Sequence, residues 1–309
     1  MPLHPPASAG KDRWSGFVEP EPGLSIPCTI LRGRSPGPRL LVTAGVHGAE
    51  YSSIEAARRL TRMPLDGLVG ELTVLPILNI EAFWQHRPYF NPRDGKNINR
   101  VFPGKTDGSP SERLAAWVSG TAMPGMSAYI DLHCGDIIEA LIPFAIFPDG
   151  HDVSRDLAVA AGFPYVMRSM AQGHSYRAAV NQGIPGVLLE SGGCGLWTEE
   201  SVTLIETGVK RIMGKLGMLP DRAGQTARPP IYTMKVATAP VAGYWHCAVS
   251  PGARVERGAP LGVIYDLAGA GEHRIAAEVS GPVIYNVTSL AISVGEPLVG
   301  IAIEEGARP

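Results

Sequence analysis

The sequence has little that points to cysteine-based metal sites, membranes or secretion. Its four cysteines, Cys28, Cys134, Cys194 and Cys247, lie far apart and form no C-x-x-C pair, which excludes a ribbon-type zinc site and a thioredoxin-like motif. No apolar run approaches membrane-spanning length. The proline-rich segment 1–14 lacks the apolar core of a signal peptide. We therefore expect a cytoplasmic protein with no membrane partner.

The sequence also lacks an excess of charge of either sign. Charged residues make up 18% of the chain and the formal net charge is -2, so the total indicates no basic surface for nucleic acid. With 309 residues, 45% of them hydrophobic, the chain can bury a large core and is long enough for two domains. We expect a small-molecule or peptide substrate. The sequence does not set the oligomeric state, so a homo-oligomer remains open.

The stretch from Val42 to Glu50 combines an apolar run with glycines, a histidine and a glutamate. His47 and Glu50 form an H-x-x-E pair, which zinc accepts when a third ligand comes from elsewhere and a fourth position is open to water. Such a pair also occurs by chance at the start of a helix, so its context matters. Residues 39–44 predict a buried strand and residues 52–62 a helix. This places the pair at the carboxyl edge of a sheet, where α/β proteins bind ligands.

A candidate for the third ligand ends another predicted strand, residues 128–135. Asp131 and His133 are two apart, so in an extended strand their side chains point to the same face. A carboxylate beside a ligand imidazole is a common arrangement around a metal. The alternative is that His133 is an ordinary histidine of the core.

Residues 79–104 are rich in turn residues and predict a long loop. Loops of this length are uncommon in compact domains unless they are functional or disordered, and the mixture of arginine, asparagine and aromatic residues is not that of a flexible linker. We interpret the segment as a substrate-binding loop. Asn99 and Arg100 place an amide beside a guanidinium, which suits the capture of a carboxylate. A lone arginine would more often be a solvated surface charge.

Four motifs in this order resemble the succinylglutamate desuccinylase and aspartoacylase family of zinc hydrolases. They are the H-x-x-E pair, Asn79-Ile80-Glu81-Ala82, the run DGKNINRVFPG at 94–104, and Asp131-Leu132-His133. Each motif is weak alone, but their joint occurrence is a strong signal. The resemblance extends from Leu40 to the end of the chain. It implies an α/β fold with a zinc carboxypeptidase-like mixed sheet flanked by helices.

The resemblance implies one Zn²⁺ per chain, held by His47, Glu50 and His133, with water in the open position. The family's general base matches Glu190, which ends an apolar strand before a glycine turn. A carboxylate placed there can take a proton from water as it attacks a carbonyl that zinc polarises. The alternative for Glu190 is an exposed glutamate of a loop.

The resemblance also implies residues that bind substrate. Asn99 and Arg100 match the pair that holds the carboxylate of an amino-acid substrate. The family has a further arginine that stabilises the developing oxyanion; Arg87 fits its spacing better, and Arg93 is the alternative. Arg177 is a candidate for contacting a substrate side chain, on the ground of its nearness in sequence to the Glu190 strand.

The sequence departs from the family pattern at three places. Ile80 stands where proline is more usual, and Cys134 stands where a small hydroxyl residue is more usual. Tyr285 is only a candidate for the tyrosine that aspartoacylases contribute from their C-terminal region. These departures put a narrow aspartoacylase specificity in doubt.

The last third of the chain differs in character. Thr198 predicts the cap of an amphipathic helix, and the polar, glycine- and proline-bearing residues 221–230 follow it. We place a domain boundary there, with a zinc-hydrolase catalytic domain over 1–228 and a smaller all-β, barrel-like domain over 229–309. The second domain resembles lipoyl and biotinyl carrier barrels but lacks their carrier lysine motif, which favours a cap or an assembly surface.

Together these features predict a zinc-dependent amidohydrolase that cleaves the amide bond of an N-acylated amino acid or a related small metabolite. The alternatives are a metallocarboxypeptidase acting on short peptides and a non-catalytic binding protein with the same fold. A binding protein has no chemical need for both a ligand set and Glu190. A C-terminal domain that caps the site favours small substrates over long chains.

Overall fold

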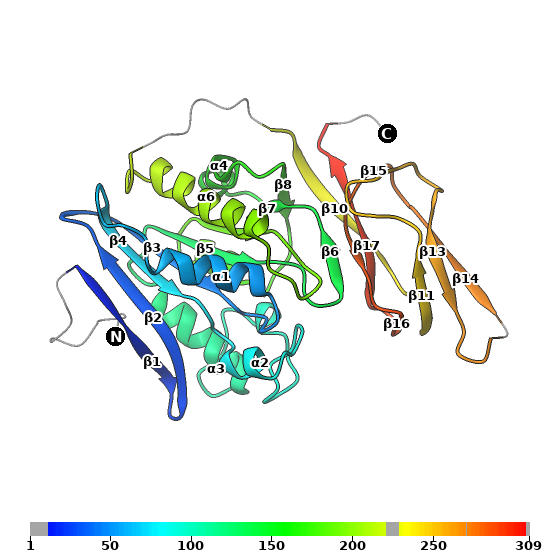
Figure 1. Cartoon of the computed structure of the whole chain (residues 1–309), viewed down its shortest axis with the longest axis horizontal. Helices are drawn as coiled ribbons and strands as arrows, with labels where there is room; N and C mark the ends of the chain where they lie inside the picture. Colours follow the sequence, from blue (N-terminus) through cyan, green and yellow to red (C-terminus); the bar gives the residue numbers. More distant parts are fainter. Residues whose placement is uncertain (1–11, 221–228, 270, 307–309) are drawn as a thin grey trace.

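A computed structural model of the chain describes residues 12–220, 229–269 and 271–306. Within these ranges a 13-stranded mixed sheet runs through the molecule, and a four-stranded sheet lies at its C-terminal end (Figure 1). The strand order in the large sheet is β1-β2-β4-β3-β5-β9-β7-β8-β10-β17-β15-β12, with β6 paired to β15. The predicted mixed α/β architecture with a β-rich C-terminal region is confirmed.

Four parallel strands form the centre of this sheet. They are β4 (Val69–Leu75), β3 (Ser35–Ala44), β5 (Ala128–His133) and β9 (Gly186–Glu190). All of β5 is buried, as expected for a strand that is covered on both faces. Antiparallel pairing extends the centre on both sides, through β2 to β4 and through β7 to β9. These outer strands are β1 (Arg13–Glu21), β2 (Leu24–Arg32), β7 (Phe144–Pro148) and β8 (Tyr165–Ser169).

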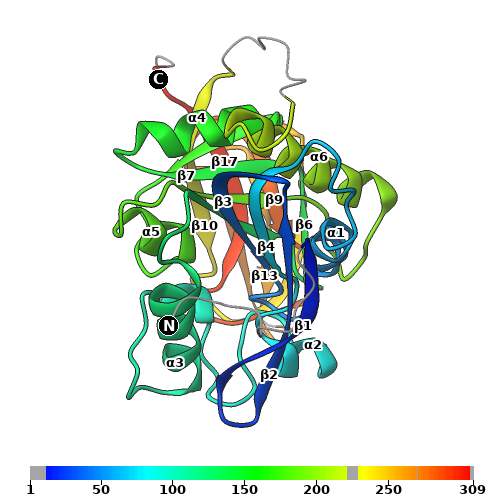
Figure 2. The same ribbon diagram turned by 90° about the vertical axis from the view of Figure 1, so that its left-hand side faces the viewer.

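Helices cover both faces of the sheet (Figure 2). One face carries α1 (Tyr51–Leu60), α4 (Asp152–Ala161) and α6 (Glu199–Lys215), and the other carries α3 (Pro110–Trp117), η2 (Val118–Ala122) and α5 (Ser175–Val180). Each face has its own apolar core. Thr198 caps α6 as predicted, because its side chain accepts a hydrogen bond from the backbone of Ser201. None of the helices described is long and apolar enough to cross a membrane.

The predicted substrate-binding loop is only partly irregular. It contains the short helix α2 (Ile80–Trp84), whose first turn is capped by the side chain of Asn79, and the 3-10 turn η1 (Ile98–Arg100). The rest of the segment has no helix or strand. The loop crosses from the end of β4 toward α3, which brings its second half close to the carboxyl ends of the central strands.

The C-terminal region consists of strands around an apolar core that includes Trp245, Leu261 and Val299. Its strands are β10 (Ile231–Thr238), β11 (Gly243–Cys247), β12 (Arg254–Val255), β13 (Pro260–Tyr265), β14 (Glu272–Ala276), β15 (Gly281–Val287), β16 (Ala291–Ile292) and β17 (Pro297–Glu304). β10 continues the large sheet by pairing with β8, and β6 (Glu139–Leu141) pairs with β15. The predicted boundary at 221–230 lies mostly outside the described residues, so the division at 228 stays a prediction.

Candidate active site

Three central strands lead to polar side chains at one edge of the sheet. β3 is followed by the turn that carries His47 and Glu50, β5 ends at His133, and β9 ends at Glu190. His133 and Glu190 are partners in the register of β5 and β9. Because the carboxyl ends of parallel strands meet at the same edge, residues far apart in the sequence come together here.

The turn after β3 requires glycine at two positions. Gly45 has φ +61°, a left-handed conformation that L side chains rarely adopt. A Cβ at Gly48 would lie 2.2 Å from backbone atoms of Ala82 and Phe83, so any side chain there would displace α2. The turn ends at Glu50, and α1 begins at the next residue. The tight backbone packing therefore sets where His47 and Glu50 point.

His47, Glu50 and His133 form one cluster of potential metal ligands. One ligand atom from each lies within 4.8 Å of the others, and the three side chains are buried. Nδ1 of His47 lies 2.5 Å from Oε1 of Glu50, and Nδ1 of His133 lies 2.9 Å from Oε2. Two imidazole nitrogens and a carboxylate that converge in this way are a zinc-type donor set, so the residues fit the ion that the sequence predicts.

The outer nitrogens of both imidazoles also have partners. Nε2 of His47 lies 3.0 Å from Oδ1 of Asn97, and Nε2 of His133 lies 3.0 Å from Oδ2 of Asp131. A carboxylate only accepts hydrogen bonds, so Asp131 fixes the hydrogen of His133 on Nε2. The proton between Nδ1 and Glu50 can then be replaced by a metal ion, because the Nδ1 side of the ring faces Glu50. Asp131 and His133, which the sequence placed on the same face of one strand, thus also contact each other.

Asp131 is itself held by hydroxyl groups. Thr43 Oγ1 donates to its Oδ1 at 2.7 Å, and the hydroxyl of Ser175 donates to its Oδ2. The carboxylate is fully buried, and these hydrogen bonds compensate for its removal from water. The ring orientation of His133 therefore rests on β3, β5 and α5 together.

The electrostatics of the cluster favour a positive charge between the ligands. Burial alone would raise the pKa of Glu50, but the neighbouring His133 and His47 outweigh it and lower the pKa to about 2. Burial opposes charge on His47 as well, and Glu50 overcomes this and raises the pKa of His47. In the metal-free protein the imidazoles thus compensate Glu50 with protons, a role that a divalent cation can take over.

Glu190 lies beside this cluster but is not paired with a cation. Its carboxylate is half-buried and has no hydrogen bond or ion pair with any residue that the structure describes. Burial, with a smaller contribution from the charges of Glu50 and Glu139, raises its pKa to about 8 against the opposing effect of His133. A bound cation would lower this pKa again. Glu190 is therefore available to exchange a proton, as a general base must.

Comparison of the sequence with models of known protein families identifies the family. A model of the succinylglutamate desuccinylase/aspartoacylase catalytic domain matches residues 36–216, more than half of the chain. The chain belongs to this family. The resemblance inferred from four short motifs is thereby confirmed.

Individual proteins are similar to this chain over nearly its whole length. The N-alpha-acetyl-L-2,4-diaminobutyric acid deacetylase of Halomonas elongata is 30% identical over 96% of this chain and 89% of that protein. The product-bound ectoine utilization protein EutE (DoeB) of Ruegeria pomeroyi superposes with a TM-score of 0.85 at 24% identity, covering 98% of this chain and 99% of that one. A succinylglutamate desuccinylase/aspartoacylase structure from Rhodobacter sphaeroides gives 0.83 at 22% identity, covering 95% and 97%. At these identities the two structures show the shared fold.

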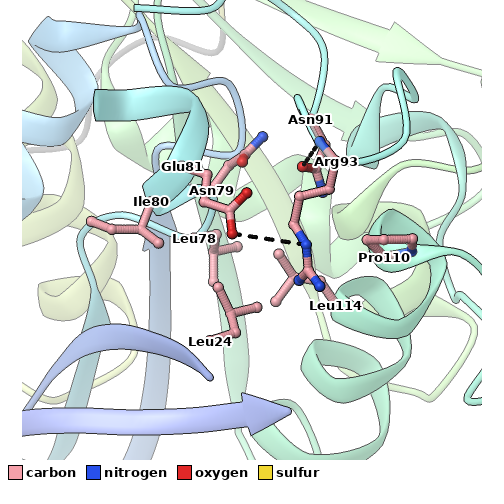
Figure 3. Close-up of a pocket in the computed structure, with 9 residues that line it drawn as sticks. All are labelled: Leu24, Leu78, Asn79, Ile80, Glu81, Asn91, Arg93, Pro110 and Leu114. Carbon is pink, nitrogen blue, oxygen red and sulfur yellow. Dashed lines mark hydrogen bonds and ion pairs between the residues drawn. The ribbon is translucent and has the colours of Figure 1, made fainter. Parts of the chain in front are cut away.

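The two arginines proposed for the oxyanion differ in their surroundings. Arg93 is ion-paired with Glu21 and lies 3.8 Å from Glu81, beside a cavity of about 10 Å³ that holds one water molecule at most (Figure 3). Arg87 is exposed, and its guanidinium has no ion pair within the described part of the chain. Arg87 is therefore the arginine that is free to meet a ligand.

Asn99 and Arg100 lie on the cluster side of η1. Oδ1 of Asn99 accepts a hydrogen bond from the backbone of Ser175 at 2.9 Å, and its Nδ2 is 3.2 Å from Nε2 of His133. Since that nitrogen carries a hydrogen for Asp131, the amide of Asn99 keeps its own hydrogens for another acceptor. Arg100 is exposed and donates from Nη1 to its neighbour's carbonyl and to Nε2 of His174, each at 2.9 Å.

Two further candidates have different outcomes. Arg177 donates to the carbonyl oxygens of Asp149 and Ser169, which ties it to the fold, so the structure does not support a substrate contact. Tyr285 is close enough to the site for two of its glutamates to act on it. It is half-buried in β15, and burial together with the charges of Glu139 and Glu190 raises its pKa.

Several neighbours of the site could not be found by sequence reasoning. His174 accepts from Arg100, and burial followed by the charge of Arg100 lowers its pKa to about 4. Asp136 accepts from the backbone of Tyr89 at 2.9 Å and of Ile137 at 2.7 Å. Asp136 thus holds the segment that carries Arg87. Only its position shortly after His133 could have signalled this role.

Proposed function

We propose that this chain is a zinc-dependent deacylase that hydrolyses the amide bond of an N-acylated amino acid. One observation carries the proposal: a buried cluster of His47, Glu50 and His133 lies beside the unpaired carboxylate of Glu190. The Halomonas relative supports it and supplies the first substrate to test, N-alpha-acetyl-L-2,4-diaminobutyrate.

In this proposal His47, Glu50 and His133 hold the zinc. When bound, the ion supplies Lewis acidity toward the amide carbonyl and makes water more acidic. Asp131 and Asn97 keep the two imidazoles in the tautomer that binds metal. The three strands and the packed turn hold these side chains on a rigid support.

Glu190 acts as the general base. It takes a proton from the attacking water as the carbon–oxygen bond forms, and it returns that proton to the nitrogen as the carbon–nitrogen bond breaks. The products are the free amino acid and the carboxylate of the acyl group. A base that serves in both steps needs a pKa close to neutrality, and the burial of Glu190 moves its pKa in that direction.

The arginines divide between the oxyanion and the substrate carboxylate. Arg87 donates to the oxygen that becomes negative when water adds to the carbonyl, because its guanidinium has no other partner among the described residues. Arg100 and the free amide hydrogens of Asn99 bind the carboxylate of the amino acid. His174 keeps the guanidinium of Arg100 in place.

The C-terminal region favours small substrates over peptides. β15 pairs with β6, so Tyr285 lies against the side of the site where Glu139 and Glu190 are found. A chain that continued beyond the scissile bond on this side would meet β15. This observation ranks deacylation above the carboxypeptidase alternative.

A substrate panel tests the proposal. The zinc-loaded protein is offered N-acetyl and N-succinyl amino acids alongside dipeptides with the same C-terminal residue. We expect release of free amino acid from one or more N-acyl substrates and little from the dipeptides. Cleavage of the dipeptides alone would show carboxypeptidase activity in place of deacylation. If no substrate of the panel were hydrolysed, a binding protein would be favoured.

A further inference from the structure

Glu139 lies between the two loops that follow the site strands. It begins β6, a few residues after His133, and its carbonyl oxygen accepts hydrogen bonds from the backbone nitrogen of Cys194 at 2.8 Å and from its thiol. A Cβ at Gly193 would lie 2.2 Å from that oxygen, and one at Gly135 would lie 2.7 Å from it. The backbone of Glu139 is therefore clamped between the loop after β5 and the loop after β9.

The carboxylate of Glu139 has little to compensate its charge. Its Oε2 accepts one long hydrogen bond of 3.4 Å from the backbone of Asp136, and no arginine, lysine or histidine of the described residues pairs with it. It is half-buried, and burial raises its pKa. Retaining an uncompensated carboxylate at such a place costs stability, and groups of this kind concentrate at ligand sites.

The surroundings of Glu139 belong to the active site. It is the register partner of Val287 where β6 pairs with β15, which places it on the side of the site covered by β15, and its charge raises the pKa of Glu190 and of Tyr285. It also lies beside Tyr89, whose buried hydroxyl donates toward its carboxylate and whose ring centroid lies 6.0 Å from that of His47. A carboxylate that has neutral hydrogen-bond donors but no cationic partner among the described residues forms a subsite for a hydrogen-bond donor with a positive charge.

The other charged groups around the site already have roles. Glu50 belongs to the metal cluster, Glu190 is the free base, and Asp136 is occupied by backbone hydrogen bonds. Arg87 and Arg100 would repel an ammonium group. Glu139 is therefore the carboxylate left over for a cation on the substrate.

We propose that Glu139, with Tyr89 beside it, recognises an ammonium group on the side chain of the substrate. This inference rests on the proposed deacylase function. It assigns the enzyme to N-acyl amino acids that carry a second, free amino group. The substrate would then be held at three points: its carboxylate at Arg100, its amide at the metal cluster and its ammonium at Glu139.

The test compares two substrates of equal length. N-alpha-acetyl-L-2,4-diaminobutyrate carries the ammonium, and N-acetyl-L-norvaline has a methyl group in its place. We measure kcat/KM for both with the zinc-loaded wild type, with Glu139→Gln, and with Glu278→Gln as a control. Glu278 is an exposed glutamate of the C-terminal region, paired with Lys235, and its loss should change neither rate. Gln keeps the shape of Glu139 and can still accept from Asp136.

We expect the wild type to prefer the ammonium substrate, and Glu139→Gln to reduce that preference about ten- to hundred-fold, the usual effect of one charge-assisted hydrogen bond. For N-acetyl-L-norvaline, Glu139→Gln should change kcat/KM by less than about threefold, because this substrate has no ammonium group to contact Glu139. Equal use of both substrates by the wild type, or an unchanged preference in the variant, would overturn the role of Glu139 and leave the deacylase function standing. Hydrolysis of neither substrate nor any other N-acyl amino acid would overturn both.

Discussion

His133 and Glu190 face each other across two neighbouring parallel strands, each as the last residue of its strand. One is a candidate metal ligand and the other is the candidate base. Backbone hydrogen bonds between β5 and β9 fix their separation, so the base cannot move away from the ligand cluster without breaking the sheet. Sites built on strands hold such a geometry better than sites built on loops.

Replacing Glu190 by Gln should separate catalysis from metal binding. The variant keeps the size of the side chain and loses the proton acceptor, so we expect kcat to fall by about 10²- to 10⁴-fold. The zinc content should stay that of the wild type, because Glu190 is not part of the ligand cluster. Steady-state kinetics and elemental analysis of the same preparation measure both. Turnover close to the wild-type value would remove Glu190 from the role of base.

Arg87 and Arg93 form a matched pair of substitutions. Arg87→Ala should lower kcat by about 10²- to 10³-fold, the usual effect of removing one oxyanion donor, with little change in the melting temperature. Arg93→Ala should leave kcat nearly unchanged and cost about 1 kcal/mol of stability or less, since it loses ion pairs at the surface. Kinetics and thermal unfolding distinguish the two. The opposite pattern would show that Arg93 is the oxyanion arginine.

Zinc should stabilise the protein more at high pH than at low pH. In the metal-free fold the pKa values of His47 and Glu190 are raised, that of Glu190 to about 8. The folded protein then holds protons that the unfolded chain has already released, from about pH 4.5 to 8 for Glu190 and above about pH 6.5 for His47. The stability of the metal-free protein therefore falls as the pH rises through this window.

Zinc replaces those protons on the imidazoles, so its binding strengthens as the pH rises. We expect the gap in melting temperature between zinc-loaded and chelator-treated protein to be wider at pH 8 than at pH 6. Thermal unfolding in matched buffers measures it. In metal-free Glu190→Gln the stability should decline less steeply as the pH rises. A difference in melting temperature that becomes smaller toward pH 8 would contradict this account.

The sequence was most informative where local pattern and local structure coincide. The apolar runs that precede His47, His133 and Glu190 correctly predicted buried central strands, and parallel pairing then brings the three residues together. The four short motifs identified the family, because the spacing of the residues within each motif can be read directly from the sequence.

Contacts between distant segments could not be predicted in the same way. His174 meets Arg100 across 74 positions, and Asp136 holds the backbone of Tyr89 across 47 positions. Arg177 seemed suited to a substrate because it precedes the Glu190 strand, but its guanidinium reaches backbone carbonyls instead. Such pairings depend on how loops cross the edge of the sheet, which periodicity and motif spacing do not encode.

Metal stoichiometry tests the central claim most directly. Elemental analysis of the purified, zinc-supplied protein should find about one zinc per chain, as expected from the one cluster of three ligands among the described residues. His133→Ala should lose it, while His246→Ala, which removes an exposed histidine of the C-terminal strands, should keep it. Absence of zinc from the wild type, or its retention in His133→Ala, would contradict the proposed metal centre.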